Sequence, residues 1–295
     1  MVKQVIWQAA EGHRYGEQLQ FVSQFPAYVT DTSPQEIAWW YRRQDEADYV
    51  KFYLDSDGIS IEVIGDQIAA QRAMRTALPP LPQKAEATAY PEPHQSLYRR
   101  FGGIRPVLFL DAFEGLAWSI LGQQITVHFA AHLKEAIAFH WGTVVRGSRT
   151  PLAVFPSPRQ LAGATVEDLC SLKLSRQKAE ALIAIARRID QGAWDIHGVY
   201  QQSTEEAMEA LPRFKGIGPW SAEYSLLRVF GHADVLPAAD VGLRRAGARL
   251  AGRERVSELE LREAAQIWRG CRSGFAFWLW LSNVASRARH EEQGL

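Results

Sequence analysis

The chain has 295 residues, of which 47% are hydrophobic and 22% are charged, and its formal net charge at pH 7 is zero. That length is sufficient for two or three domains. The sequence has no run of roughly 18 apolar residues and no secretory signal pattern, which argues against a membrane-spanning helix and against export. The two cysteines, Cys170 and Cys271, lack metal-ligand spacing. We therefore expect no iron–sulfur cluster, no disulfide framework and a reducing, cytoplasmic location.

The charged residues are unevenly distributed along the chain. Residues 1–90 contain 8 Lys and Arg against 12 Asp and Glu, so the remainder carries a compensating positive excess. Basic residues in that remainder gather at 99–105, 173–188 and 244–255. Such clusters can follow a nucleic-acid backbone, but solvated helix faces explain them as well. Charge alone does not identify a partner.

The N-terminal part has the clearest strand signals. Segments 49–54 and 59–64 flank an Asp-Ser-Asp-Gly turn, which predicts a β-hairpin. A short helix is expected at 67–78, and a proline-rich connector follows at 79–93. We predict a small α+β domain with an antiparallel sheet at 1–88.

Beyond the connector, apolar residues recur at steps of three and four, which is typical of helices. We expect helices at 111–123, 127–141, 156–170, 176–189, 205–211, 220–230, 241–250, 258–268 and 274–289. The predicted fold is therefore mainly α, with a helical region at 89–295 behind the α+β domain.

The segment Leu-Pro-Arg-Phe-Lys-Gly-Ile-Gly-Pro-Trp-Ser-Ala at 211–222 predicts a tight turn between two helices. Gly216 ends one short helix, and Gly218 precedes the next, whose first position is Pro219. Glycines let the main chain approach a ligand, and the amides of a helix start form an anion site. A purely structural turn would use the same glycines.

Asp240 directly precedes the predicted helix at 241–250. An aspartate there is a good N-cap, which is the usual structural reason for its presence. The helix dipole also keeps such a carboxylate ionised. An ionised carboxylate can stabilise the oxocarbenium-like sugar that forms when an N-glycosidic bond is hydrolysed. Asp234, the nearby rival, falls in the loop before Pro237, away from the helix start.

The segment Ile-Leu-Gly-Gln-Gln-Ile-Thr at 120–126 predicts a helix that breaks at Gly122 and restarts at Thr126. A kink with two solvated glutamines is the structural alternative.

These segments together resemble the helix-hairpin-helix (HhH-GPD) DNA glycosylases, in the branch of the bacterial 3-methyladenine DNA glycosylase II. The family repeats Leu-Pro-Gly-[Ile/Val]-Gly-x-x-[Ser/Thr]-Ala in its hairpin, and Lys215 is a departure from that pattern. The catalytic aspartate of the family follows the hairpin by about twenty residues, which implies that role for Asp240. The Gln-Gln turn resembles the family segment that fills the gap left by an extruded base, which implies a wedge at Gln124.

The resemblance implies three further sets of site residues. The residues expected to contact DNA are Gln124, Lys215, Gly216, Gly218, Trp220 and Ser221. The expected base pocket consists of Trp118, Trp220 and Tyr224. Main-chain carbonyls expected to hold a monovalent cation, Na⁺ or K⁺, belong to Pro212, Phe214 and Ile217.

The implied activity is removal of flipped alkylated purines such as 3-methyladenine and 7-methylguanine from double-stranded DNA, leaving an abasic site. Bifunctional relatives have a lysine at the Trp220 position, and tryptophan cannot form a Schiff base, so a monofunctional enzyme without a required cofactor is expected. A related pocket has tryptophan beside an Arg-Ser pair, whereas Cys271 precedes Arg272 here, which leaves the substrate range open.

The resemblance also implies a monomer whose helical region has two lobes, one at 114–232 and one at 89–113 plus 233–295. Two alternatives stay open. The chain could be a glycosylase for an oxidised or deaminated base, or a non-catalytic DNA-binding protein that uses only the hairpin.

Overall fold

The structure, a computed structural model, describes residues 3–7, 29–32, 36–43, 46–55, 58–63, 90–145 and 151–292, with side chains described at 90–145 and 151–284. No helix among these residues is long and apolar enough to cross a membrane.

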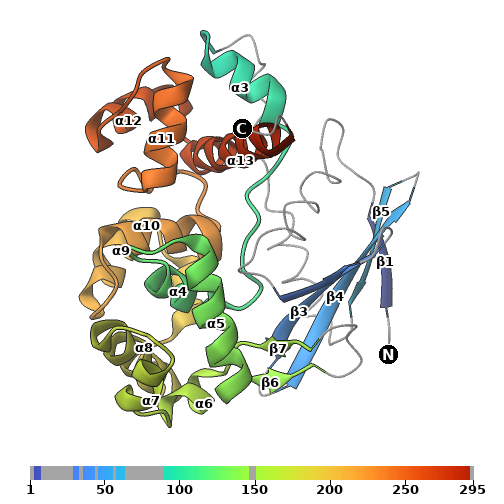
Figure 1. The fold of residues 1–295 in the computed structure, drawn as a ribbon, viewed down its shortest axis with the longest axis vertical. Coiled ribbons are helices and arrows are strands. Elements are labelled where there is room, and N and C mark those ends of the chain that lie inside the picture. The colour runs from blue at the N-terminus through green and yellow to red at the C-terminus, as the bar shows by residue number, and fades with distance from the viewer. Residues whose placement is uncertain are drawn as a thin grey trace.

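Five strands in the N-terminal part form one antiparallel sheet (Figure 1). Their order is β1-β5-β4-β3-β2, with β1 at Lys3–Trp7, β2 at Val29–Thr32, β3 at Glu36–Arg43, β4 at Glu46–Asp55 and β5 at Gly58–Val63. The predicted hairpin is confirmed by β4 and β5, in which Asp55 pairs with Gly58. The helix predicted at 67–78 and the connector before residue 90 lie outside the described residues.

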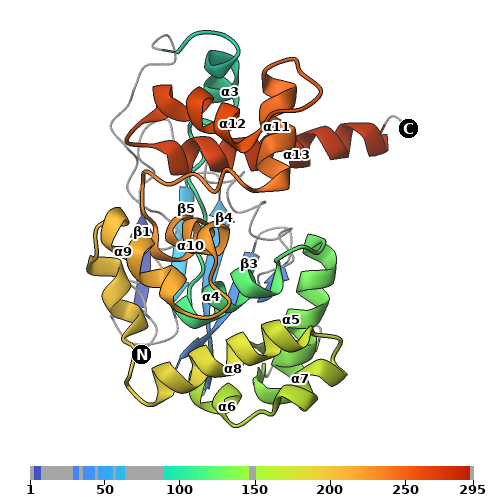
Figure 2. The ribbon, with the colours of Figure 1, turned by 90° about the vertical axis from the view of Figure 1, so that its left-hand side faces the viewer.

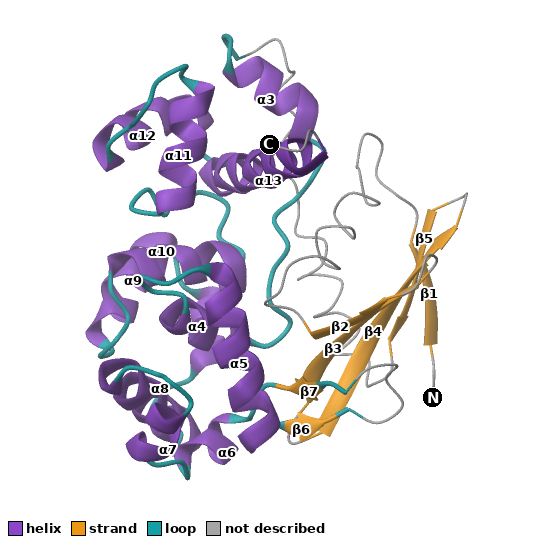
Figure 3. Cartoon of the chain, viewed as in Figure 1, coloured by secondary structure: helices purple, strands orange, loops and turns teal. Residues whose placement is uncertain are grey.

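The described helices form two groups, which the two views separate in the same way (Figures 1 and 2). The first group contains α4 (Ala112–Leu121), α5 (Val127–Trp141), α6 (Pro158–Ala162), α7 (Val166–Ser171), α8 (Arg176–Asp190), α9 (Thr204–Ala210) and α10 (Pro219–Ser225). The second group contains α3 (His94–Phe101), α11 (Val241–Leu250), α12 (Glu258–Ala264) and α13 (Arg272–Glu292). The fold is mainly helical, as predicted (Figure 3).

Short segments of other secondary structure join these helices. Tight helical turns occur at η2 (Ile196–Gln201), η3 (Leu211–Arg213) and η5 (Ala265–Trp268), and η4 (Leu226–Phe230) is a π-helix that continues α10. Strands β6 (Thr143–Val144) and β7 (Ala153–Val154) pair with each other and contact β4 and β3 of the large sheet.

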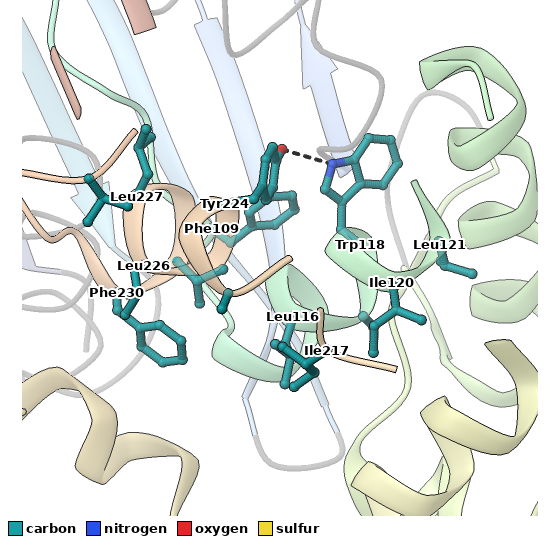
Figure 4. Close-up of a cluster of buried hydrophobic side chains, with 14 of the residues drawn as sticks. Phe109, Leu116, Trp118, Ile120, Leu121, Ile217, Tyr224, Leu226, Leu227 and Phe230 are labelled. Carbon is teal, nitrogen blue, oxygen red and sulfur yellow. Dashed lines mark hydrogen bonds between the residues drawn. The ribbon is translucent and has the colours of Figure 1, made fainter. Parts of the chain in front are cut away.

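Helix α4 lies at the centre of the first group, where all of its residues are buried and it contacts α5, α8 and α10. A helix buried on every side is apolar around its whole circumference, and its sequence has that character. Its one acidic side chain, Glu114, forms a buried ion pair of 2.6 Å with Lys134 of α5. Figure 4 shows Leu116 and Ile120 of α4 gathered with Ile217 in one hydrophobic cluster. This packing fixes α4 against the loop that precedes α10.

Most predicted helices are confirmed, but three segments differ from expectation. The helix predicted at 156–170 is wrong, because Gly163 divides it into α6 and α7, each starting with a capping box. The second half of the helix predicted at 220–230 is the wider π-helix η4. The second half of the helix predicted at 258–268 is the tighter helical turn η5. Gly216 does not end a helix, because α9 and η3 stop at Arg213 and Gly216 lies in the following loop.

Candidate active site

Asp240 lies where the two helix groups meet. It is the N-cap of α11, and its Oδ1 accepts the backbone N–H of Leu243 at 2.8 Å. Two indole N–H groups also point at the carboxylate, from Trp220 of α10 to Oδ2 and from Trp280 of α13 to Oδ1, both at 3.3 Å. The predicted N-cap role is confirmed. Three donors from three helices therefore hold one half-buried carboxylate in a fixed orientation.

Four aromatic side chains form a cluster beside Asp240. Trp220 and Tyr224, one turn apart on α10, have ring centroids 5.3 Å apart, and Tyr224 is 5.7 Å from Trp280. The Trp118 indole donates to the Tyr224 hydroxyl at 3.0 Å, as the dashed line in Figure 4 shows. Trp220 and Trp280 are half-buried, whereas Trp118 and Tyr224 are 4% and 6% exposed. Trp118 and Tyr224 thus support the two half-buried rings from within the protein.

A buried cation belongs to the same cluster. Arg228, in the π-helix after α10, lies within 5.9 Å of the Tyr224 ring centroid and 5.8 Å of the Trp280 ring centroid. Burial raises the pKa of the Tyr224 phenol, although the positive charge of Arg228 acts in the opposite direction. The phenol therefore stays neutral and able to accept the hydrogen bond from Trp118.

The hairpin loop between η3 and α10 has two glycines with different roles. Gly216 has φ of +92°, and a Cβ there would overlap the Cβ of Ala181. Gly218 has an ordinary φ of −83°, and a Cβ there would meet nothing within 4 Å. Gly216 is therefore required by the fold, whereas Gly218 leaves the main chain open to whatever approaches from outside.

The N-terminus of α10 has no side-chain cap. Among the described α-helices from α4 to α12, each of the others begins with a Ser, Thr or Asp side chain that accepts a backbone N–H of the first turn. Ser221 follows Pro219 and Trp220 in that first turn, and its own side chain is buried. Lys215, in the loop before it, forms an exposed ion pair with Glu180 at 2.8 Å. The start of α10 is accordingly the one among these helices whose first-turn N–H groups have no side-chain acceptor from the N-cap.

The predicted wedge, Gln124, is exposed and has φ of +57°. A left-handed backbone is unusual for a residue other than glycine and carries strain that the surroundings must hold. Its neighbour Gln123 reaches across to the hairpin, where its Nε2 donates to the Gly216 carbonyl and to the Ser221 hydroxyl, both at 2.8 Å. The side chain of Gln123 therefore joins the turn at 120–126, called the wedge turn below, to the hairpin loop.

Lys178 of α8 fixes the same turn from the other side. Its Nζ donates to the carbonyl oxygens of Leu121 and Gln123, both at 2.7 Å. Burial lowers the pKa of this ammonium group from its usual value. Lys178 thus caps the end of α4 just before the strained Gln124.

Asp234 is paired with Arg272, and no hydrogen bond among the described residues joins it to the aromatic cluster. The guanidinium of Arg272 donates to both of its oxygens, at 2.6 and 2.7 Å. Burial would raise the pKa of Asp234, but the hydrogen bonds and charge of Arg272 outweigh burial and lower it. The adjacent Ser273 bonds to Val235 and to the His232 carbonyl. Arg272 and Ser273 therefore fasten the loop before α11 to the start of α13.

The carbonyls considered for a cation belong to Pro212, Phe214 and Ile217, in the loop before α10 and the turn η3. The Phe214 carbonyl accepts the Ile217 N–H at 3.0 Å, which leaves its second lone pair for another partner. Among the described residues, no three His, Cys, Asp or Glu side chains come together as a metal site.

The structure therefore brings together Asp240, Trp220, Tyr224 and Trp118, as the sequence suggested, and places Gln124 next to the hairpin. Sequence reasoning missed two members of the site, Gln123 and Trp280, and the buried Arg228 that contacts the aromatic rings. Gln123 had a visible signal, because it adjoins the proposed wedge. Trp280 had none, since only tertiary packing carries it to Asp240 from forty residues away.

Comparisons with known proteins identify the family and the fold. The family model described as "HhH-GPD superfamily base excision DNA repair protein" matches residues 117–270. The chain is 32% identical over 183 residues to the DNA-3-methyladenine glycosylase of Bacillus subtilis (strain 168), covering 62% of this chain and 60% of the relative. It is 32% identical over 185 residues to DNA-3-methyladenine glycosylase 2 of Escherichia coli (strain K12), covering 61% and 62%. The matches thus span about three-fifths of these relatives' length.

Solved structures share the fold over a larger part of the chain. The 3-methyladenine DNA-glycosylase from Archaeoglobus fulgidus superposes with a TM-score of 0.80 and 26% identity, covering 95% of this chain and 98% of that one. An 8-oxoguanine glycosylase/lyase from Clostridium acetobutylicum, in complex with double-stranded DNA, gives a TM-score of 0.64 at 17% identity, covering 88% and 98%. The second likeness shows a common fold and nothing about substrate.

Proposed function

Because this chain belongs to the HhH-GPD superfamily of base excision DNA repair proteins, we propose that it is a monofunctional DNA glycosylase. In this proposal it hydrolyses the N-glycosidic bond of alkylated purines, of the 3-methyladenine and 7-methylguanine type, and leaves an abasic site. The names of the Bacillus and Escherichia relatives support the substrate class.

Asp240 is the catalytic carboxylate of this proposal. When the bond between base and sugar breaks, the sugar becomes an oxocarbenium-like cation, which a fixed negative charge stabilises. The Leu243 N–H and the two indole N–H groups hold the carboxylate in place. The group is preorganised, so little reorganisation accompanies the reaction.

Trp220 supports the monofunctional assignment. Cleavage of the DNA strand by a glycosylase requires an amine nucleophile that forms a Schiff base with the sugar. An indole has no such nucleophile, and its N–H donates to Asp240 instead. Water is then the nucleophile that captures the sugar cation.

The hairpin and the wedge turn are the DNA-binding elements of this proposal. The uncapped start of α10, with Gly218, Trp220 and Ser221, binds one DNA phosphate through main-chain N–H groups, and Lys215 adds a positive charge nearby. Gln124 enters the gap that the flipped nucleotide leaves. The flipped base stacks on the half-buried rings of Trp220 and Trp280.

Carbonyl oxygens of Pro212, Phe214 and Ile217 would coordinate a monovalent cation in the hairpin loop. Such an ion would supply a local positive charge that strengthens phosphate binding at the start of α10. The second lone pair of the Phe214 carbonyl suits this role.

The proposal extends to the organisation of the chain. Residues 1–88 form an accessory domain, and the two helix groups are the lobes 114–232 and 89–113 plus 233–295, between which Asp240 is presented. The enzyme works as a monomer in the cytoplasm on double-stranded DNA.

The observation that carries the proposal is the carboxylate of Asp240, held by donors from two helix groups at the expected distance after the hairpin. The test incubates purified protein with DNA methylated by a simple alkylating agent. We expect free 3-methyladenine and 7-methylguanine, with strands that break only after alkali. Strand breaks before alkali, together with an adduct trapped by borohydride, would contradict the monofunctional mechanism, and an absence of free base would contradict the function.

A further inference from the structure

Arg228 is a buried charge that the proposed reaction has not yet used. Its side chain is 2% exposed, and its Nε–H donates to the Val107 carbonyl at 2.8 Å. It lies in the π-helix that follows α10, at the junction of the two helix groups. Burial of a guanidinium is costly unless its surroundings stabilise it.

Aromatic rings in and beside the candidate base site are among the neighbours of Arg228. Its Cζ lies 5.5 Å from the ring centroid of Phe277, 5.8 Å from Trp280 and 5.9 Å from Tyr224. Trp280 also donates from its indole to Asp240. One ring is therefore in contact with a fixed cation and a fixed anion.

The charges of Arg228 and Asp240 both act on the Tyr224 phenol. After burial, which raises its pKa most, Arg228 lowers the pKa of the phenol and Asp240 raises it. The aromatic cluster thus carries an electric field between a positive and a negative group.

We propose that Arg228 is a specificity-determining residue that promotes release of purine lesions that are uncharged before the bond breaks. This inference rests on the proposed function, since it assigns a substrate class to the same site. The chemical argument concerns the charge on the departing base.

In both substrate classes the C1′–N bond breaks and its electron pair goes to the base, while water captures the sugar cation and releases a proton. A base alkylated on a ring nitrogen begins as a cation and leaves neutral. An uncharged base, such as the deaminated purine hypoxanthine, leaves as an anion and then takes up the proton that the water releases. Arg228 stabilises only the departing anion, and one of the rings that it contacts, Trp280, is a ring on which the base stacks in the proposed function.

The expected effect of Arg228 on the rate is the Coulomb attraction between its positive charge and the negative charge of the departing base, in a partly screened site. A unit charge about 8 Å away, at an effective dielectric constant of about 20, changes a rate by about tenfold or more. For the cationic base the transition state is nearly neutral at the base, so the loss of Arg228 should change kcat/KM by less than about threefold.

The test compares R228Q with R228K on duplexes that contain a single hypoxanthine or a single 7-methylguanine. Gln keeps a donor for the Val107 carbonyl without the charge, and Lys keeps the charge. We expect R228Q to lose about tenfold or more in kcat/KM on hypoxanthine and less than about threefold on 7-methylguanine. R228K should keep the wild-type ratio between the two substrates. A purely structural role would lower both rates together in R228Q.

Equal losses on the two substrates, or the same ratio in R228Q and R228K, would overturn the role of Arg228 while the wild-type enzyme still releases both bases. A wild-type protein that releases neither base contradicts the proposed function instead.

A second measurement serves if R228Q does not fold. Wild-type rates are measured on a series of uncharged purines whose N9 acidity differs. Stabilisation of the departing anion predicts a shallower dependence on acidity than for uncatalysed hydrolysis, and an equally steep dependence overturns the inference.

Discussion

Helices α10 and α11 follow one another in the chain, but only α11 has a side chain that accepts a backbone N–H of its first turn. Gly218 begins α10 without a side-chain hydrogen bond, whereas Asp240 begins α11 and accepts the N–H of Leu243. The dipole of each helix favours negative charge at its start. In the proposed function one start therefore accepts an anion from outside, whereas the other is occupied by the protein's own carboxylate.

In the proposed function this difference separates DNA binding from chemistry. A phosphate at the start of α10 would be held by main-chain groups, which recognise no particular sequence. The carboxylate at the start of α11 is held in addition by Trp220, which belongs to α10. The two starts are thus joined by a single indole, so that a DNA backbone bound at one is placed relative to the charge of the other.

The largest expected effect comes from removing the charge at the start of α11. Asp240→Asn keeps the size of the side chain and its ability to cap the helix. We expect single-turnover excision to fall by about two orders of magnitude or more, the usual scale for losing a key electrostatic group. The melting temperature should stay close to that of the wild type, and affinity for DNA should not fall.

Asp234→Asn is the matched control for this change. It breaks the ion pair with Arg272, so it should lower stability while excision by the folded protein stays within about threefold. If Asp240→Asn retains nearly full activity at an unchanged melting temperature, or if Asp234→Asn is the inactive variant, the carboxylate has been misassigned.

The next largest effect tests the open start of α10. Gly218→Val places a side chain in empty space at an ordinary φ, so the protein should fold. The added side chain blocks the approach of a phosphate, and we expect affinity for abasic DNA of any sequence to fall by about tenfold or more. Titration of a labelled duplex measures this.

Gly216→Val gives the contrasting result. Its positive φ and the overlap with Ala181 should destabilise the fold itself, by about 2 kcal/mol or more. Wild-type affinity of a folded Gly218→Val protein would mean that the hairpin is only a turn.

The cap of α11 could be predicted from the sequence, whereas the other hydrogen-bond partners of Asp240 could not. Asp240 and the helix after it are local features, and the capping role follows from residue type and position. The partners of Asp240 are not local, because Trp280 arrives through the packing of α13 on α11. The left-handed backbone of Gln124 was equally invisible, since the turn is held by tertiary hydrogen bonds, from Lys178 of α8 and from Gln123 to the hairpin.

Other errors were avoidable from the sequence. Ser157 with Gln160 and Thr165 with Asp168 are two capping boxes, and they mark two helix starts where one helix was predicted. The N-terminal hairpin was predictable because its strands alternate and its turn contains glycine.

A smaller effect is expected where the hairpin meets the wedge turn. Gln123→Ala removes the hydrogen bonds to Gly216 and Ser221 but leaves the Lys178 contacts to the main chain. We expect base flipping to fall by about tenfold while affinity for undamaged DNA changes little, because the wedge loses its placement and the phosphate site remains. A fluorescent base beside the lesion reports flipping.

Gln124→Ala is the companion variant, since it removes the wedge itself. Both variants should therefore slow flipping, and the double variant should add little to Gln124→Ala. Independent, additive losses would show that Gln123 does not act through the wedge.

The smallest effect concerns the ion pair that joins α10 to the second helix group. Glu223 of α10 is 7% exposed and lies 2.8 Å from Arg262 of α12, which also binds Glu258. Burial raises the pKa of Glu223 above its usual value even though Arg262 lowers it. A carboxyl whose pKa is raised on folding adds stability below its unfolded pKa and loses that contribution as pH rises through the folded pKa.

At neutral pH the ionised Glu223 is therefore a net cost to the folded state, and Glu223→Gln should stabilise the protein or destabilise it by less than about 1 kcal/mol. Arg262 keeps Glu258 as a partner, so the substitution leaves no unpaired cation. The melting temperature of the variant minus that of the wild type should be larger at pH 8 than at pH 5. If the variant instead loses more stability at pH 8 than at pH 5, the attraction of Arg262 exceeds the cost of burial, and this ion pair, together with the Trp220 indole, fixes the start of α10 relative to Asp240.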